Sequence, residues 1–152
     1  MQVTQALKDN YLFRGLTEDQ FDAVMALTQE KSFDGGETLV RQFGRDTDLL
    51  VVLSGAALIK TFSGDAIVEV GPGSVIGEIS LIDDEPRSAT VTCKGTTSVA
   101  VIPSEAIKNM MKHDRDLRCT LMENIAKVLC RRLRSANVQL DSAMASQAEA
   151  VR

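Results

Sequence analysis

An acid and an arginine lie nine residues apart in the segment from Gly77 to Val91, which reads GEISLIDDEPRSATV. Arg87 carries a planar fork of donors that matches two phosphate oxygens at once. A carboxylate such as Glu78 repels phosphate, so its presence nearby makes sense if it accepts hydrogen bonds from another part of the same ligand. A ribose hydroxyl is the natural donor. The pair therefore predicts a site for a phosphate joined to a sugar.

The residues between them favour an anion as well. The run Ile79–Ile82 can form one helical turn, and the first N–H groups of such a turn have no internal partner. Gly77 can take a positive φ and lets another part of the chain approach closely. Ser88 adds a hydroxyl and an N–H beside Arg87.

A purely structural interpretation is the alternative. A glutamate and an arginine at this separation are most often an exposed ion pair of small energetic value, and Gly77 can simply serve a turn. The joint pattern favours a ligand site, because the fold would otherwise have little reason to bury the charge of Arg87.

The segment resembles the phosphate-binding cassette of cyclic nucleotide-binding domains, in which G-E-[LI]-[AS]-L is followed a few residues later by R-[STA]-A-x-V. Every fixed position of that pattern is filled, by Gly77, Glu78, Ile79, Ser80, Leu81, Arg87, Ser88, Ala89 and Val91. The resemblance extends upstream through Phe33, Gly36, Glu37, Gly44 and Gly55 and covers roughly residues 5–140.

This resemblance implies a role for each site residue. Glu78 would bind the ribose 2′-hydroxyl, and Arg87 would bind the exocyclic oxygens of a cyclic phosphate lying under the short turn. The remaining phosphate oxygens would meet N–H groups near Ile79, Ser80, Ser88 and Ala89. Ile67 and Val68 would line the sugar and base with apolar surface.

The resemblance is less definite about the base. In the bacterial transcription-factor branch, a polar pair just after R-R-L on the C-terminal helix reaches the purine, often across a dimer. The residues in that place here are Ala136 and Asn137, so one of the two departs from the pattern. Asn137 can offer both a donor and an acceptor to adenine, but it is equally a polar residue that flanks an apolar seam of that helix. Ser88, where threonine often accompanies cGMP preference, favours cAMP as the ligand over cGMP.

Composition indicates one compact soluble domain of 152 residues, with 44% hydrophobic and 25% charged residues. No apolar run approaches the roughly 18 residues of a membrane span, and the N-terminus lacks a signal-peptide core. We therefore expect a cytoplasmic protein that does not contact a membrane. The net charge of −4 argues against nonspecific nucleic-acid binding.

The sequence offers little for catalysis. A single histidine cannot supply the usual metal set, and no base-activated nucleophile is evident. We therefore predict no metal site and no enzymatic activity. Cys93, Cys119 and Cys130 are irregularly spaced and are interpreted as small buried or half-buried hydrophobic residues.

The periodicity predicts a mainly β fold with flanking helices: a β-roll or double-stranded β-helix (jelly-roll) barrel, N-terminal helices and a long C-terminal helix. Thr17 and Gln20 form a helix start that leads to about Leu27. From Ser32 to Ile102, short β-branched runs alternate with glycines, with Ser63-Gly64-Asp65 as a hairpin turn. We expect residues 1–113 to form the barrel with its N-terminal and short B-type helices, and residues 114–152 to form the long helix and tail.

Two helices are expected after the barrel. Ser104 is a plausible cap for the first helix, and the second starts near Asp114. A seam of apolar residues at alternating four- and three-residue steps follows on the second helix, at Met122, Ala126, Leu129, Leu133, Ala136, Leu140 and Ala143. Its first part should pack on the barrel and the remainder should form a parallel homodimer. The alternative is an amphipathic helix that lies on its own domain.

Two functions follow. The first is a module that binds a cyclic mononucleotide, most favourably cAMP, and transmits occupancy through the C-terminal helix to a dimer interface or a protein partner not yet identified. The alternative is a structural or interaction domain that binds another ligand, such as a cyclic dinucleotide, or none, or a regulatory fragment of a larger channel, kinase or transcription factor. Because the chain ends at Arg152, before the helix-turn-helix domain of the family's transcription factors, we expect no direct DNA binding.

Overall fold

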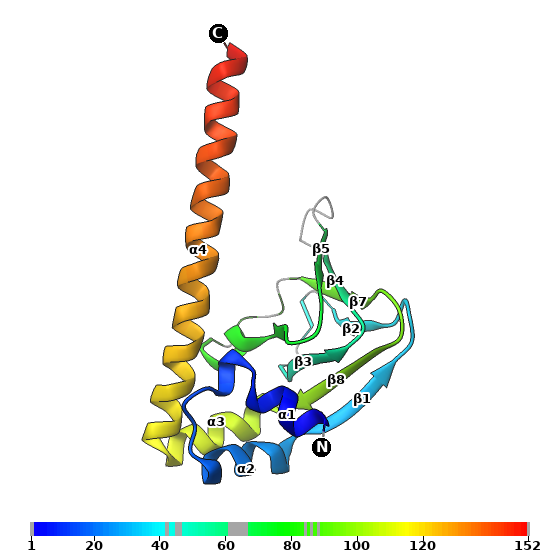
Figure 1. Cartoon of the computed structure of the whole chain (residues 1–152), viewed down its shortest axis with the longest axis vertical. Helices are drawn as coiled ribbons and strands as arrows, with labels where there is room; N and C mark the ends of the chain where they lie inside the picture. The colour runs from blue at the N-terminus through cyan, green and yellow to red at the C-terminus, as the bar shows by residue number, and fades with distance from the viewer. Residues whose placement is uncertain are drawn as a thin grey trace.

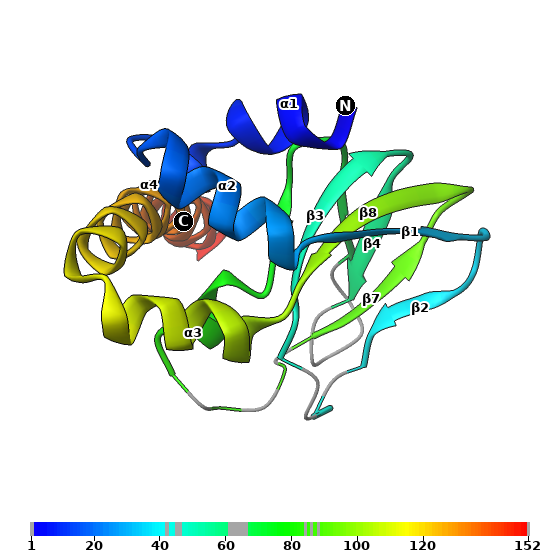
Figure 2. The same ribbon diagram turned by 90° about the horizontal axis from the view of Figure 1, so that it is seen from below.

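A computed structural model describes residues 2–41, 43–44, 47–60, 67–83, 85, 87 and 89–151. Two four-stranded antiparallel sheets face each other, with strand orders β1-β8-β3-β6 and β2-β7-β4-β5. The helices gather at one side of this barrel, and the C-terminal helix extends well beyond it (Figures 1 and 2). The predicted fold class, a jelly-roll barrel with flanking helices, is confirmed.

The first sheet joins β1 (Gln29–Phe33), β8 (Thr97–Ile102), β3 (Leu49–Ser54) and β6 (Val75–Ile76). The second sheet joins β2 (Thr38–Val40), β7 (Thr90–Cys93), β4 (Ala57–Lys60) and β5 (Ile67–Val70). The predicted turn at Ser63-Gly64-Asp65 lies outside the described residues, although β4 and β5 on either side of it pair in antiparallel register from Ala57↔Val70 to Lys60↔Ile67.

The central strand β3 is apolar along almost its whole length because both of its faces are buried. Successive side chains of a strand point to opposite faces. Leu49 and Val51 accordingly pack into the core beneath the helices, whereas Leu50 and Val52 pack into the core between the two sheets. This strand therefore links the helical layer to the interior of the barrel.

The N-terminal helical layer contains α1 (Gln2–Lys8), the short 3-10 helix η1 (Tyr11–Phe13) and α2 (Glu18–Leu27). Thr17 and Gln20 form a capping box at the start of α2, as predicted. The other helices are η2 (Glu78–Leu81), a 3-10 turn between β6 and β7, then α3 (Ser104–His113) and α4 (Arg115–Val151). In the described part of the chain, none of the helices is both long and apolar enough to cross a membrane.

Two sequence predictions about the C-terminal helices need correction. Ser104 is the first residue of α3 and not its cap, since its hydroxyl donates to Thr47 Oγ1 at 2.8 Å. The start of α4 is as predicted: the Asp114 carboxylate accepts a hydrogen bond from Leu117 N at 3.0 Å. The first part of the predicted seam packs on the core only in part: Met122 and Leu129 pack against it, but Ala126 is exposed. The fully buried stripe of α4 consists instead of Leu117, Leu121 and Ile125.

The cysteine prediction is wrong for two of the three residues. Cys93 is buried in β7, but Cys119 and Cys130 are exposed on α4. Cys119 lies on the side of the helix opposite to the buried stripe, and Cys130 lies beyond its last buried residue, Ile125. The face of a helix on which a residue lies is fixed by its position in the sequence, whatever its own preference for burial.

The buried stripe on α4 predicts that substitutions at neighbouring positions of the helix differ sharply in their effect on the free energy of unfolding. Leu121 is fully buried, so Leu121→Ala should lower the free energy of unfolding by about 2–5 kcal/mol through lost burial and a residual cavity. Glu123 is exposed and pairs with the exposed Lys127 one turn away, at 3.5 Å. Glu123→Ala should therefore cost less than about 0.5 kcal/mol. Urea denaturation of both variants checks this, and equal losses would contradict the packing described.

Candidate ligand-binding site

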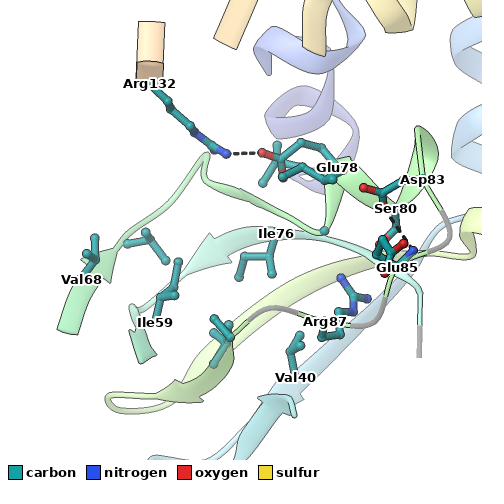
Figure 3. A pocket seen from close by; sticks show the side chains of 16 residues that line it. Val40, Ile59, Val68, Ile76, Glu78, Ser80, Asp83, Glu85, Arg87 and Arg132 are labelled. Carbon is teal, nitrogen blue, oxygen red and sulfur yellow. Dashed lines mark hydrogen bonds and ion pairs between the residues drawn. The ribbon is translucent and has the colours of Figure 1, made fainter. Parts of the chain in front are cut away.

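A cavity of about 490 Å³ lies between the second sheet and the turn η2. Its wall is mainly apolar, and acidic and basic side chains enter it from several elements (Figure 3). The lining residues are Val40, Ile59, Val68, Val70, Val75, Ile76, Gly77, Glu78, Ile79, Ser80, Asp83, Glu85, Arg87, Ala89, Val91 and Arg132. A cavity of this size, with few polar groups on apolar walls, is typical of a small-molecule site.

Gly77 allows the Arg87 guanidinium to lie against the start of η2. It caps the N-terminus of η2 in the left-handed region, with φ of 91°. A Cβ atom there would collide with the Arg87 guanidinium and would lie 3.1 Å from the carbonyl oxygen of Asp48. Glycine is therefore required twice, once for the backbone conformation and once for the space that Arg87 occupies.

Arg87 is buried, with 8% of its surface exposed. Its Nη2 donates to the carbonyl oxygen of Asp48 at 2.5 Å. The backbone of Arg87 is held by the loop after β2, because its carbonyl accepts a hydrogen bond from Phe43 N at 2.9 Å. These contacts come from segments that are distant in sequence, and together they hold the guanidinium at the cavity wall.

Glu78 is even more buried, at 3% exposed, and pairs with Arg132, an arginine that the sequence analysis did not place at the site. The Arg132 Nη1 of α4 donates to Glu78 Oε1, and Figure 3 shows this side chain reaching across to the cassette. About half of the Arg132 side chain, 53%, is exposed. Glu78 itself is the signal that could have pointed to a partner such as Arg132, since a buried carboxylate requires a charged or hydrogen-bonding partner.

The two arginines approach the cavity from different ends. Arg132 meets Glu78 at one end, whereas Arg87 lies at the other, near Asp83 and Glu85 (Figure 3). Asp83 and Glu85 are exposed at the rim and linked by a hydrogen bond from Glu85 N to Asp83 Oδ1 at 3.3 Å. The site thus offers one buried cationic group to an anion and one buried carboxylate to a donor.

The structure brings most of the predicted site residues together. Seven of them line the cavity: Val68, Gly77, Glu78, Ile79, Ser80, Arg87 and Ala89. Ser88 lies outside the described residues, and for Ile67 only the backbone, in β5, is described. Asn137 is exposed on α4, beyond Arg132, and within the described part of the chain it is not among the lining residues.

Sequence reasoning missed much of the apolar wall. Val40, Ile59, Val70, Val75, Ile76 and Val91 come from five different strands. Val75 belongs to the core beneath the helices and the other five pack in the core between the sheets, so which residues meet at the cavity depends on how the strands pair. Sequence spacing alone does not determine that pairing.

Comparison with known proteins now identifies the family. Residues 30–114, more than half of the chain, match the cyclic nucleotide-binding domain. The chain belongs to the cyclic nucleotide-binding domain family. This match includes the whole cassette and all eight strands except the first residue of β1.

Individual relatives agree with this assignment. The Cyclic AMP receptor protein of Thermus thermophilus is 29% identical, in an alignment that covers 89% of this chain and 62% of that protein. The regulatory domain of Toxoplasma gondii PKA, solved with cAMP, is 29% identical with a TM-score of 0.65 and covers 71% of this chain and 42% of that one.

A cyclic nucleotide-binding domain from Methylobacillus flagellatus has a TM-score of 0.74 at 22% identity, over 91% of this chain and 80% of that one, and supports the fold. The present chain spans less than two thirds of the length of the first curated relatives it matches, from 22% to 62%.

The double requirement at Gly77 can be tested against a second glycine of the family domain. Gly36 has nearly the same φ, 87°, but a Cβ there would meet nothing within 4 Å. Gly36→Ala should therefore cost only the left-handed strain of about 1–2 kcal/mol. Gly77→Ala should lower the free energy of unfolding further, because Arg87 or Asp48 must also move. Denaturant titrations of the two variants provide the comparison. Equal losses of unfolding free energy would show that Arg87 and Asp48 do not block a Cβ atom at position 77.

Proposed function

We propose that this chain is a regulatory module that binds a cyclic mononucleotide, with cAMP favoured over cGMP, and carries out no catalysis of its own. The observation that carries the proposal is the opening of one buried carboxylate, Glu78, and one buried guanidinium, Arg87, onto the same mainly apolar cavity. A sugar joined to a phosphate has the matching donor and acceptor, and a purine matches the apolar wall.

In this proposal the phosphate lies against Arg87 and the start of η2. The guanidinium supplies charge-assisted hydrogen bonds to the phosphate oxygens, and these bonds are stronger than neutral ones in a site that excludes water. The N–H groups near Ile79, Ser80, Ser88 and Ala89 supply the remaining donors. Gly77 permits the close approach of the arginine to the turn.

The sugar and base would occupy the other end of the cavity. Glu78 accepts a hydrogen bond from the ribose 2′-hydroxyl, and Val68 of β5, which lines the cavity, covers the base. Two relatives whose names or titles mention cAMP support the choice of cAMP. Ser88 at the position after the arginine supports the same choice.

The Arg87 side chain provides the direct test. Arg87→Ala should weaken cAMP binding by about 30- to 1,000-fold, or about 2–4 kcal/mol, because it removes the charge-assisted contact with the phosphate. Arg115→Ala, at an exposed arginine at the start of α4, is the matched control and should leave the affinity unchanged. Isothermal titration of nucleotide-free protein measures both variants.

Two outcomes would overturn the proposal. If the unaltered chain neither binds nor competes with cAMP at roughly 1 mM, the cavity serves another ligand or none. If Arg87→Ala binds cAMP as tightly as the unaltered chain, then the nucleotide lies elsewhere.

We further propose that α4 carries the signal. Its first half packs on the barrel, while residues 131–148 are all exposed, including Leu133 at 64% and Leu140 at 58%. These leucines lie seven residues apart, the repeat of a coiled-coil seam. A parallel homodimer would bury them, and it would bring Asn137 near the partner subunit. Arg132, at the start of the exposed half, connects this helix to Glu78 in the cavity.

The exposed half of α4 predicts the state of association. The unaltered chain should sediment as a dimer at tens of micromolar, on the order of the concentrations where such helices associate. A chain carrying Leu133→Glu and Leu140→Glu should be a folded monomer, because both charges fall on the seam. Arg134→Glu, at an exposed position outside the seam, is the control. A monomeric unaltered chain, with and without cAMP, would contradict the dimer.

A further inference from the structure

Two further carboxylates line the cavity beside Arg87. Asp83 and Glu85 lie at its rim, and both residues are exposed. Figure 3 shows them at the end of the cavity where Arg87 lies, away from the pair that Glu78 forms with Arg132. Acidic side chains at the mouth of an anion site oppose the entry of an anion, so their presence there needs an explanation.

The chain holds both carboxylates within electrostatic reach of the Arg87 guanidinium. Glu85 is two residues before Arg87, so their Cα atoms are at most about 7 Å apart. Asp83 is fixed to η2, because its N–H donates to the carbonyl of Ile79 at 3.0 Å. The guanidinium lies against the start of the same turn, where it fills the space of a Cβ atom at Gly77. Charges this close act on one another in solution, because the Debye length at 0.1 M salt is about 10 Å.

The charged residues that line the cavity are divided between its two ends. Within the described part of the chain they are Glu78, Asp83, Glu85, Arg87 and Arg132. Glu78 and Arg132 pair with each other, so their charges largely cancel. The other end therefore combines one buried cation with two exposed carboxylates. It attracts an anion at close range through Arg87 and repels additional negative charge from the rim.

The phosphate groups of nucleotides differ in charge according to their chemical class. A cyclic phosphate is a phosphodiester and carries one negative charge. A phosphomonoester carries nearly two negative charges at neutral pH, because its second pKa is about 6. The Coulomb energy between a ligand and each carboxylate scales with the charge of the ligand. The rim therefore opposes a monoester about twice as strongly as a cyclic phosphate.

We propose that Asp83 and Glu85 determine specificity at the phosphate end of the cavity, where they favour a singly charged cyclic phosphate over a doubly charged phosphomonoester. They form no binding site of their own and act on the ligand that Arg87 holds. The inference rests on the proposed function, because it concerns the ligand of the same cavity. It adds a means of rejecting linear nucleotides, whose base and ribose are the same as those of the cyclic ligand.

Competition titrations with cAMP and adenosine 5′-monophosphate at about pH 7.5 and low salt test this role. Asp83→Asn combined with Glu85→Gln should strengthen the binding of cAMP about threefold and that of the monoester about tenfold, because the monoester has about twice the charge. Asparagine keeps an oxygen that can accept the hydrogen bond from Glu85 N. Glu85→Gln alone leaves Asp83 unchanged and should give about half of the effect on a logarithmic scale.

The matched control is Asp22→Asn combined with Glu123→Gln. It changes the charge of the chain by the same amount, at exposed positions that do not line the cavity. This variant should leave the ratio of the two affinities unchanged. A control that shifts the ratio as much as the rim variant would show that the total charge of the chain is responsible, and would overturn the inference.

A lower pH separates the effect of charge from that of shape. At about pH 5.5, below the second pKa of the monoester, both ligands carry close to one negative charge. The described lining residues include no histidine, the side chain whose charge ordinarily changes in this range. The roughly threefold advantage that the rim variant gives the monoester over cAMP should therefore fall toward one. An advantage that persists at the lower pH would overturn the inference.

The titrations also distinguish this inference from the proposed function. If the unaltered chain binds cAMP and the rim variant changes the two affinities by the same factor, or changes neither, then the carboxylates do not select by charge. The inference then fails and the proposed function stands. If the unaltered chain binds neither nucleotide, both are overturned.

Discussion

The placement of two opposite charges, Glu78 and Arg87, inside one small cavity is the constraint on which the rest of this structure depends. Each charge loses its hydration, and each must be compensated by the protein or by a ligand. Arg87 is supported by the carbonyl of Asp48, and Glu78 is supported by Arg132 from a different element. Gly77, directly before Glu78, leaves room for the guanidinium. The local sequence of the cassette, the loop before β3 and the C-terminal helix are therefore all linked through the charge balance of one site.

The barrel holds these charges in fixed positions because its central strand is buried on both faces. Leu49 and Val51 anchor β3 to the helices, and Leu50 and Val52 anchor it to the opposite sheet. A close-packed interior transmits a displacement and does not absorb it. The helical layer and the cavity thus share one support, as the proposed response of α4 to a ligand requires.

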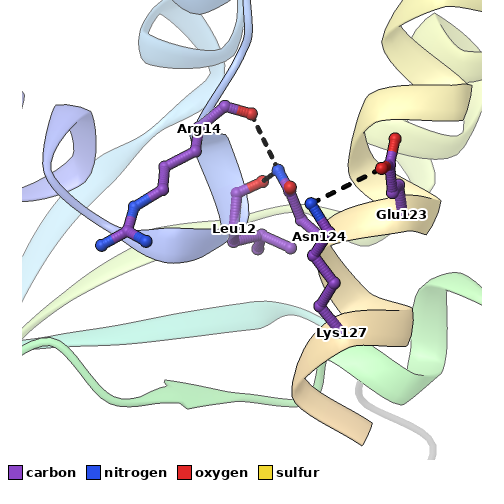
Figure 4. Close-up of polar contacts among 5 residues, drawn as sticks. All are labelled: Leu12, Arg14, Glu123, Asn124 and Lys127. Atoms are coloured by element: carbon purple, nitrogen blue, oxygen red, sulfur yellow. Dashed lines mark hydrogen bonds and ion pairs between the residues drawn. The ribbon is translucent and has the colours of Figure 1, made fainter. Parts of the chain in front are cut away.

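The long helix α4 has two halves with different physical roles. The first half presents Leu117, Leu121 and Ile125 to the core. Its Asn124 side chain donates hydrogen bonds to the carbonyls of Leu12 and Arg14 in the N-terminal segment (Figure 4). The second half exposes its leucines and contacts the site through Arg132. Among the described residues, the Arg132–Glu78 pair ties this exposed half to the barrel. This arrangement suits the proposal that the position of the helix depends on what Glu78 binds.

The sequence by itself determined the fold class, the cassette and the start of each helix near Thr17 and Asp114, because these depend on local patterns: strand alternation, capping residues and the spacing of Glu78 and Arg87. It did not determine the face of α4 that packs, the exposure of Cys119 and Cys130, or the capping role wrongly assigned to Ser104. The partnership of Glu78 with Arg132, 54 residues away, was also beyond it. These features depend on which segments meet in three dimensions, and contacts between distant segments leave no periodic signal in the chain.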